Sequence, residues 1–352
     1  MGTRSVLVTG AFGMVGTETV LRLREAGAAV IATDLQTPAN LKAARRLPDG
    51  VEVRWSDLTD ESQTEALLAE VAPATIIHLA AVIPTACYEK PDLARAVNVE
   101  GTRSLVTCAQ RLPSRPRFVM ASSVAVHGSR NPHRNGLLHA DSPLRPVDSY
   151  GSQKLAAELI VRNSRLDWAI LRLGAVVSAR LRSLPVSSNV LFLEWAMPSD
   201  GRVNTVDVRD VASAFAAATT ADIVGETLMI GGDESHRLLQ GDMGPAIVAA
   251  MGLRDCYPAG RPGNPDDDAA WFVCDWMDTA RAQEALAFQN HSWPDMLHEI
   301  GMRVGWWRYL FAAIAPAVRL MLRRRMPYRG LPGVYADPWN LVTRRWPGAA
   351  PE

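Results

Sequence analysis

"VTGAFGMVGTE" (residues 8–18) places Gly10, Gly13 and Gly16 at three-residue intervals directly after the apolar run 5–8. In a dinucleotide-binding turn the first glycine permits a tight bend, the second lets backbone approach a pyrophosphate, and the third lets the following helix pack closely on the sheet. That helix N-terminus then offers free N–H groups to phosphate oxygens. Glycines also mark ordinary turns, but here a strand precedes the pattern and a helix follows it. The residues predicted to line the ligand site in this turn are Gly10, Phe12, Gly13 and Met14.

Short apolar runs alternate with longer helical patterns over the first 175 residues or so. The predicted strands are 4–9, 28–33, 51–55, 74–80, 117–122 and 167–173. The predicted helices between them include 14–26, 60–71, 92–111 and 149–164. This alternation predicts an α/β fold: a Rossmann-type, doubly wound parallel sheet with helices on both faces.

The alternation ends near residue 175, which predicts a change of architecture. A loop is expected at 178–189, a short strand and helix at 204–220, a strand and turn at 225–235, and another loop at 260–268. We therefore expect three parts: a dinucleotide-binding domain (1–175), a smaller α/β substrate-binding part (176–300) and a basic helical tail (301–352). The substrate pocket is expected between the first two parts.

An acid at the end of the second predicted strand tests the dinucleotide interpretation. Asp34 closes "AAVIATD", where a carboxylate accepts hydrogen bonds from both ribose hydroxyls and repels a 2′-phosphate. Since the next basic residue is Lys42, we predict NAD rather than NADP; the alternative is a turn aspartate without a ligand. His78 is expected to be a packed, hydrogen-bonded strand residue. Further residues expected near the cofactor at the ends of the third and fourth strands are Asp57, Leu58, Leu79, Ala80 and Ala81.

Catalytic chemistry is indicated by "ASSVAVHG" (121–128) and "DSYGSQK" (148–154). Tyr150 and Lys154 are four residues apart, so on a helix they share one face. A neighbouring ammonium is expected to lower the pKa of the phenol, which makes Tyr150 a candidate general acid/base near neutral pH. Ser123, at the end of the fifth strand, is placed to hydrogen-bond a substrate oxygen.

Taken together, these motifs make the chain resemble the extended short-chain dehydrogenases/reductases, the branch called the NAD-dependent epimerase/dehydratase family. The resemblance rests on "TGAFGMVG", Asp34, "DL" (57–58), "HLAA" (78–81), "NVEGT" (98–102), "SSVAVHG", "YGSQK", "LRLG" (171–174) and "VDVRDVA" (206–212). It implies that Tyr150 is the acid/base, that Lys154 also binds the nicotinamide ribose, and that Ser123 contacts the substrate oxygen. It places Asn98 in a structural or cofactor-facing position.

Departures from the family pattern narrow the reaction. Sugar-nucleotide dehydratases of the family typically carry Thr-Asp-Glu where this chain has Ser123, Val124 and Ala125. Valine and alanine side chains carry no titratable group, so 4,6-dehydration is excluded. What remains is an oxidoreductase acting on a secondary alcohol or ketone, or an epimerase that retains its cofactor. The alternative from another class is a non-catalytic NAD-binding sensor.

Other departures bear on the substrate. Members that bind nucleotide sugars usually have asparagine where this chain has Ala175, and often arginine where it has Val203, next to Arg202. His127 replaces a tyrosine of the family, and it is either a substrate contact or a satisfied pocket-wall histidine. The residues predicted to face a small-molecule substrate are Val124, His127 and Ala175.

The C-terminal tail is basic, although the 352-residue chain has zero net charge. Residues 303–352 contain nine arginines against Asp337 and Glu352, so they carry +7 and the rest of the chain carries −7. The stretch 305–325 combines tryptophans, arginines and apolar residues, and its longest charge-free run, 309–318, is too short to span a bilayer. It predicts either an interfacial helix on anionic lipid, which would favour a lipid- or hydroxysteroid-type substrate, or a helix packed on the body or in a homodimer. Nucleic-acid binding is not expected, because no recognisable module accompanies the charge.

Cysteine usage and the N-terminus bear on location and metals. Cys87, Cys108, Cys256 and Cys274 form no CxxC pair, so neither a disulfide framework nor a metal site is expected. The chain enters its first strand without a long apolar segment and cleavage site, so no secretory signal is expected. These features predict a cytoplasmic enzyme, with possible peripheral contact at the inner face of the membrane.

Overall fold

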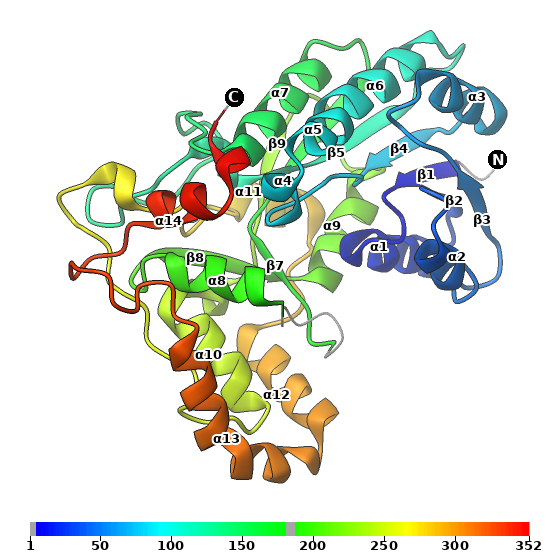
Figure 1. The fold of residues 1–352 in the computed structure, drawn as a ribbon. Coiled ribbons are helices and arrows are strands. Elements are labelled where there is room, and N and C mark those ends of the chain that lie inside the picture. The colour runs from blue at the N-terminus through cyan, green and yellow to red at the C-terminus, as the bar shows by residue number, and fades with distance from the viewer. Residues whose placement is uncertain (1–4, 181–186, 352) are drawn as a thin grey trace.

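The core of the computed structural model, which describes residues 5–180 and 187–351, is a seven-stranded parallel sheet (Figure 1). Its strands follow the order β3-β2-β1-β4-β5-β6-β9. They span Ser5–Thr9 (β1), Ala29–Asp34 (β2), Val51–Trp55 (β3), Thr75–His78 (β4), Arg117–Ser123 (β5), Asp167–Leu173 (β6) and Thr227–Ile230 (β9). The predicted fold class is confirmed. Residue 4 of the first predicted strand and residues 181–186 of the loop predicted at 178–189 lie outside the described residues.

Helices cover both faces of this sheet. Those of its two layers span Met14–Glu25 (α1), Pro38–Ala44 (α2), Glu61–Val71 (α3), Ala86–Glu89 (α4), Pro91–Arg95 (α5), Thr102–Arg111 (α6), Ser149–Arg162 (α7), Val208–Ala218 (α9) and Ala280–Leu286 (α11). A π-helical turn, Ala96–Gly101 (η1), joins α5 to α6, and a 3-10 turn, Val124–His127 (η2), follows β5. The strand order reverses between β1 and β4, so the carboxyl ends of these strands open a crevice for a ligand.

Two apolar layers hold the sheet between its helices, because side chains alternate along each strand. Val6 and Val8 of β1 pack in a layer that includes Val20 of α1 and Phe215 of α9. Leu7, between them, belongs to the opposite layer with residues of α3, α6 and α7. Both faces of the strands are therefore buried, which explains their continuous apolar runs.

Residues after 175 contribute to both sheets. A second sheet, in the order β10-β8-β7, comprises Ala175–Val177 (β7), Arg202–Asp207 (β8) and Arg237–Leu239 (β10). Yet β9 pairs in parallel with β6, and α9 packs on α1. The dinucleotide-type sheet thus includes a strand and a helix from beyond the predicted boundary at residue 175.

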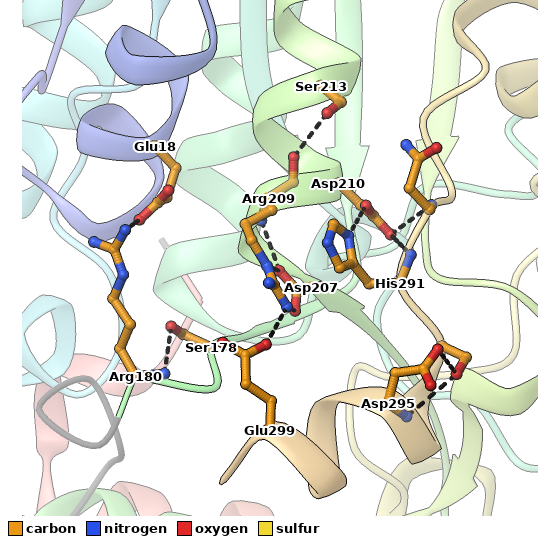
Figure 2. Close-up of polar contacts among 12 residues, drawn as sticks. Glu18, Ser178, Arg180, Asp207, Arg209, Asp210, Ser213, His291, Asp295 and Glu299 are labelled. Atoms are coloured by element: carbon orange, nitrogen blue, oxygen red, sulfur yellow. Dashed lines mark hydrogen bonds and ion pairs between the residues drawn. The ribbon is translucent and has the colours of Figure 1, made fainter. Parts of the chain in front are cut away.

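Polar contacts tie the two parts together (Figure 2). Arg180, which follows β7, pairs with Glu18 on α1 at 2.5 Å. Arg209 on α9 pairs with Asp207 and with Glu299, which lies on helix α12 (Trp293–Val304). The first ion pair joins α1 to the segment after β7, and the pair with Glu299 joins α9 to α12.

The C-terminal region has a projecting half and a returning half (Figure 1). Helices α10 (Gln240–Ala250), α12 and α13 (Trp307–Arg324) gather at the end of the molecule away from the main sheet. The chain then returns as α14 (Pro338–Arg345) and the 3-10 turn η6 (Pro347–Ala349), which contact α8 (Ser188–Ala196) and α4 respectively. Among the described helices, none is both long and apolar enough to cross a membrane.

Candidate active site

The glycine turn between β1 and α1 has the geometry that its spacing predicts. Gly10 has φ +64°, and a Cβ there would lie 2.7 Å from the backbone nitrogen of Ala80. A Cβ on Gly16 would lie 2.1 Å from the Gly10 carbonyl oxygen, so the helix and turn touch. Gly13 caps α1 without a side-chain hydrogen bond, which leaves helix N–H groups available to an anion.

A groove of about 270 Å³ opens beside this turn, at the carboxyl ends of the strands. Eight of the predicted cofactor residues line it: Gly10, Gly13, Asp34, Asp57, Leu58, Leu79, Ala80 and Ala81. The hydroxyls of Thr33 and Ser56, also in its wall, are buried and have no hydrogen-bond partner in the described structure. Buried hydroxyls without partners are costly, so they fit a polar ligand in the groove.

Asp34 stands at the edge of this groove with its carboxylate fixed. Its Oδ2 accepts the Phe12 backbone N–H (3.2 Å), and its Oδ1 accepts that of Leu35 (2.8 Å). The remaining lone pairs are free to accept ribose hydroxyls. Phe12 packs its ring on Trp55, and Met14 is exposed at the start of α1, so neither side chain lines the groove.

A buried hydrogen-bond chain fixes the turn after β4. Thr102 donates to the Asn98 carbonyl (2.8 Å), so its Oγ1 accepts from Nε2 of His78 (2.9 Å). His78 Nδ1 then accepts from Thr9 (2.8 Å), whose Oγ1 receives the N–H groups of the groove residues Leu79 and Ala80. Burial lowers the pKa of His78 to about 3, so it is neutral. His78 is thus the packed strand residue that was predicted.

Asn98 holds the same turn from its other side. Its Oδ1 accepts the Val82 N–H (2.8 Å), and its Nδ2 donates to the Val82 carbonyl and to Gln153 on α7. These three bonds occupy the side-chain amide. Asn98 therefore connects the groove wall to α7, and of its two expected roles the contacts correspond to the structural one.

The three predicted catalytic residues meet at the end of β5 and the start of α7. Ser123 ends β5, and its hydroxyl hydrogen-bonds Tyr150. Lys154, one turn further along α7, is buried and donates from Nζ to the Ala121 carbonyl (3.0 Å). A Cβ on Gly151 would lie 2.6 Å from the Ala125 carbonyl oxygen, so glycine lets α7 approach this close to η2.

The pKa of Tyr150 differs from the sequence expectation. Burial and the nearby carboxylate of Asp148 raise it well above its usual value, against the opposing hydrogen bond from Ser123. Lys154 is not among the groups that shift the pKa of Tyr150 here, and its Nζ donates to the Ala121 carbonyl. Burial lowers the pKa of Lys154 itself to about 8. In this state Tyr150 is a protonated phenol at neutral pH.

Asp148, which the sequence reasoning missed, is the N-cap of α7. Its Oδ1 accepts the Gly151 N–H (3.1 Å), and its Oδ2 accepts the hydroxyl of Tyr88 on α4 (2.5 Å). Burial raises the pKa of Asp148 to about 6. An aspartate one residue before a helix is an N-cap signal that the sequence offered.

A second group that the sequence reasoning missed is a buried ion pair behind the site. Glu158 lies one turn beyond Lys154, and both its oxygens accept from Arg172 on β6 (2.8 and 2.7 Å). Burial opposes ionisation, but Arg172 and the bond from Ser122 (2.6 Å) outweigh it and hold the pKa of Glu158 below its usual value. The i, i+4 spacing from Lys154 was the available signal.

The predicted substrate residues are distributed over different surroundings. His127 is buried, accepts at Nε2 from Arg172 (3.1 Å) and donates from Nδ1 to the Pro143 carbonyl (3.2 Å). Burial and Arg172 lower the pKa of His127 to about 4, so it is neutral and satisfied. Val124 packs with Met229 and Met277 in a separate apolar cluster, and Ala175 begins β7.

The C-terminal segment supplies an unexpected wall near Tyr150. Tyr150 packs against a cluster that includes Tyr88 of α4, Leu193 of α8, and Trp346 after α14. Phe192 of α8 and Trp339 of α14 pack on the same cluster. Tyr150 therefore packs against a buried apolar and aromatic cluster to which C-terminal residues contribute.

Comparison with known proteins connects this geometry to a family. A model of the NAD dependent epimerase/dehydratase family matches residues 6–231. Relatives include D-erythronate dehydrogenase of Cupriavidus necator, 30% identical over 49% of this chain and 55% of the relative. Another is UDP-glucose 4-epimerase 4 of Oryza sativa, which is 30% identical over 49% of this chain and 48% of the relative. The chain thus spans about half the length of these curated relatives.

Solved structures share the fold. UDP-glucose 4-epimerase of Thermotoga maritima, crystallised with UDP-glucose, has a TM-score of 0.68 and 19% identity over 87% of this chain and 99% of its own. A short-chain dehydrogenase/reductase superfamily protein of Agrobacterium tumefaciens with bound NAD has a TM-score of 0.66 and 24% identity over 91% and 99%. The matching family is NAD-dependent, in agreement with the predicted cofactor.

Proposed function

Because the chain belongs to the NAD-dependent epimerase/dehydratase family, we propose that it is an oxidoreductase or epimerase that works at the carbon of a secondary alcohol or ketone. The observation that carries the proposal is the meeting of Ser123, Tyr150 and Lys154 at the ends of β5 and α7. When bound, NAD supplies the position that accepts or returns a hydride. The protein supplies the proton chemistry.

Tyr150 is the proposed acid/base and moves the proton at its phenol oxygen. Its raised pKa keeps it protonated at neutral pH, which suits donation to a developing alkoxide. The Ser123 hydroxyl, which is hydrogen-bonded to Tyr150, would also hydrogen-bond the substrate oxygen and so place it next to the phenol. Lys154, one helical turn from Tyr150, donates from Nζ to the Ala121 carbonyl and is assigned to holding the nicotinamide ribose beside the phenol.

The residues that line the groove suit the separate parts of NAD: its pyrophosphate, its riboses and its adenine. Gly10, Gly13 and the α1 N-terminus would hold the pyrophosphate, and Asp34 the ribose hydroxyls. Asp57 and Leu58 would lie beside the adenine, and residues 79–81 would allow close approach. Tyr150 and Lys154 would hold the nicotinamide ribose.

Dehydration is not part of the proposal. Val124 and Ala125 are buried apolar residues at the positions where 4,6-dehydratases carry acidic groups. Asp148 and Glu158, the acids on the catalytic helix and at its cap, are held by Tyr88 and Arg172. The proposed chemistry is therefore limited to hydride transfer at one carbon.

The surroundings of Tyr150 favour a substrate with an apolar portion, of the hydroxysteroid or lipid type. Phe192, Trp339 and Trp346 belong to its cluster or pack on it. Arg202, near the position where nucleotide-sugar members carry arginine, is engaged: it donates to the Asn135 and Pro132 carbonyls and stacks on Trp276. A nucleotide sugar is the competing candidate, because UDP-glucose and UDP-glucuronic acid 4-epimerases share the fold.

Tyr150→Phe tests the catalytic proposal. We expect turnover to fall by about 10²–10⁴-fold, because the proton-transferring hydroxyl is lost, while NAD still binds through the glycine turn, Asp34 and Lys154. Tyr335→Phe, at an exposed tyrosine, is the matched control and should be fully active. Unchanged turnover in Tyr150→Phe would refute catalysis by this residue and favour a non-catalytic NAD sensor.

Cofactor release separates the two reaction types. The protein is purified without added NAD and denatured, and the supernatant is analysed by chromatography. Near-stoichiometric NAD or NADH indicates an epimerase that holds the cofactor through turnover. An empty protein that then binds NAD reversibly indicates a dehydrogenase, to be assayed with steroid and lipid alcohols alongside nucleotide sugars.

A further inference from the structure

Helix α13 is attached to the body along one narrow seam. Of its residues, Ala315 and Leu322 are buried, and they pack with Trp195 and Cys256. At about 100° per residue, positions seven apart lie within about 20° of each other on a helix. Val318, which is partly buried, packs on the same cluster, and the opposite side of the helix is exposed.

The side of α13 opposite this seam is apolar and exposed. Measured from Ala315 at about 100° per residue, its large apolar residues lie between about 120° and 280°. They are Trp307, Tyr309, Leu310, Ile314, Leu320 and Met321, all exposed. Trp306, 65% exposed, stacks on Trp307 at the helix start, and Met302 of α12 is 68% exposed. An apolar surface of this extent marks an interaction site.

Arginines surround this face without acidic partners. Residues 300–336 contain no Asp or Glu, and their arginines are Arg303, Arg308, Arg319, Arg323, Arg324, Arg325 and Arg329. In the part of the chain that the structure describes, Arg303 pairs with Glu299, and the other six make no ion pair. At about 100° per residue, Arg323 lies at about 80° and Arg325 at about 280°, on the two flanks of the apolar face. Arg324 lies within this face at the C-terminal end of the helix, whereas Arg308 and Arg319 lie on the side of the seam.

We propose that α13 lies flat on an anionic lipid bilayer. The apolar face enters the boundary between headgroups and acyl chains, and the flanking and C-terminal arginines contact lipid phosphates. Long arginine stems reach the headgroup level while their charge stays in water. Trp306, Trp307 and Tyr309 at the helix start are of the type that membrane interfaces favour.

Charge selects the bilayer over a second copy of the chain. A two-fold interface is self-complementary, so it would place the arginines of one α13 near those of the other. No acid within 300–336 would compensate them, and like charges across an interface cost several kcal/mol. An anionic surface compensates all of them at once.

The docked helix would place a groove at the level of the headgroups. This groove is lined by Ser188, Leu191, Phe192, Trp195, Arg325 and Arg345. Arg345 stacks over Phe192, which packs on the same cluster as Tyr150. A substrate drawn from the membrane would suit this arrangement. That last step rests on the proposed function, whereas the docking of α13 does not.

Vesicle co-sedimentation of the full chain tests the docking. Vesicles of phosphatidylcholine with phosphatidylglycerol should bind the protein, and phosphatidylcholine alone should bind it much less. Replacing Arg323 and Arg324 with glutamate should weaken partitioning by at least about thirtyfold, because each basic residue at an anionic surface contributes severalfold. The control changes Arg115 and Arg165, exposed elsewhere, to glutamate with the same change in net charge.

The outcomes are distinct. Equal partitioning of the wild type and the Arg323/Arg324 variant, or no sedimentation with anionic vesicles, overturns the proposal. A wild-type dimer in light scattering that Leu310→Ser converts to monomer, without vesicle binding, assigns the face to a second copy and also overturns it. Tyr150→Phe should sediment like the wild type, so a failed catalytic proposal is distinguishable from failed docking. Retained NAD binding confirms that each variant is folded.

Discussion

Helices α7 and α13 both carry several charged residues, and they use them in opposite ways. In α7, Lys154 and Glu158 are buried, and each has a partner: the Ala121 carbonyl for the first and Arg172 for the second. In α13, Arg319 and Arg323 are exposed, and neither forms an ion pair with another residue that the structure describes. A buried charge must be satisfied inside the protein, so it fixes internal geometry. Exposed arginines are free to be satisfied from outside.

The largest effect should follow from breaking the buried pair. Glu158→Ala leaves Arg172 buried without its carboxylate, and we expect a loss of about 3–5 kcal/mol in the free energy of unfolding. Glu100→Ala, which removes an exposed partner of Arg103, is the matched control and should cost less than about 1 kcal/mol. Urea denaturation measures both. Equal losses in the two variants would mean that burial does not distinguish these pairs.

Next in size is a pH effect at the cap of α7. The pKa of Asp148 is about 6 in the folded protein, above its ordinary 3.8, so the native state binds this proton more tightly than the unfolded state. Its stabilising contribution is complete below pH 3.8 and is lost as the pH rises through about 6, by on the order of 3 kcal/mol. The Asp148→Asn variant cannot bind this proton, so it should lack this pH-dependent contribution to stability. We therefore expect the stability of the variant relative to the wild type to rise across this window.

The same variant sharpens the catalytic proposal. Since the Asp148 carboxylate raises the pKa of Tyr150, Asp148→Asn should move the limb on which alcohol oxidation rises with pH, as the tyrosine base loses its proton, to lower pH. A profile that does not move would show that Asp148 does not act on Tyr150.

A smaller effect is expected at Asp34, whose carboxylate is half-buried, between the buried charges of α7 and the exposed arginines of α13. Asp34→Ala removes hydrogen-bond acceptors for the ribose, and we expect about 10–100-fold weaker NAD binding. The ratio of the affinity for NAD to the affinity for NADP should also decrease. Titration calorimetry with both nucleotides measures this. Asp49→Ala, at an exposed turn, should bind NAD like the wild type. Wild-type protein that binds NADP as tightly as NAD would contradict the role of Asp34.

The smallest effect belongs to the exposed arginines themselves. Arg319→Ala should change the free energy of unfolding by no more than about 0.5 kcal/mol, because its side chain has no partner within the described structure to lose. Thermal unfolding of the free protein checks this. A loss of several kcal/mol would mean that Arg319 serves the fold and would weaken the case for an external anionic surface.

Sequence predicted what depends on local spacing. The glycine turn, Asp34, and the placing of Tyr150 and Lys154 one turn apart on one helix are encoded within short windows, and the strand and helix limits follow apolar runs. The returning strand β9 was missed as a member of the main sheet, because 53 residues separate its start from the end of β6 and the runs between them carry no pairing signal. The wall at Trp346 was missed for the same reason.

Electrostatics were predicted less well than positions. The i, i+4 spacing places Lys154 next to Tyr150, but the pKa of the phenol depends on burial and on Asp148 as well. The partner of Glu158 lies on β6, fourteen residues away in sequence. The pKa of a titratable side chain depends on the helices and strands packed around it. A periodic sequence pattern gives information only about the helix or strand in which it occurs.

The returning C-terminal segment also has a consequence in time. Trp339 follows Tyr150 by 189 residues, which a ribosome adds in roughly 10 to 40 seconds at the usual rate of 5–20 residues per second. The dinucleotide turn and α7 are synthesised well before the aromatic wall exists. A nascent chain therefore passes through a stage in which Tyr150 has been synthesised but Trp339 and Trp346 have not. Until those residues are added, the apolar cluster against which Tyr150 packs is incomplete.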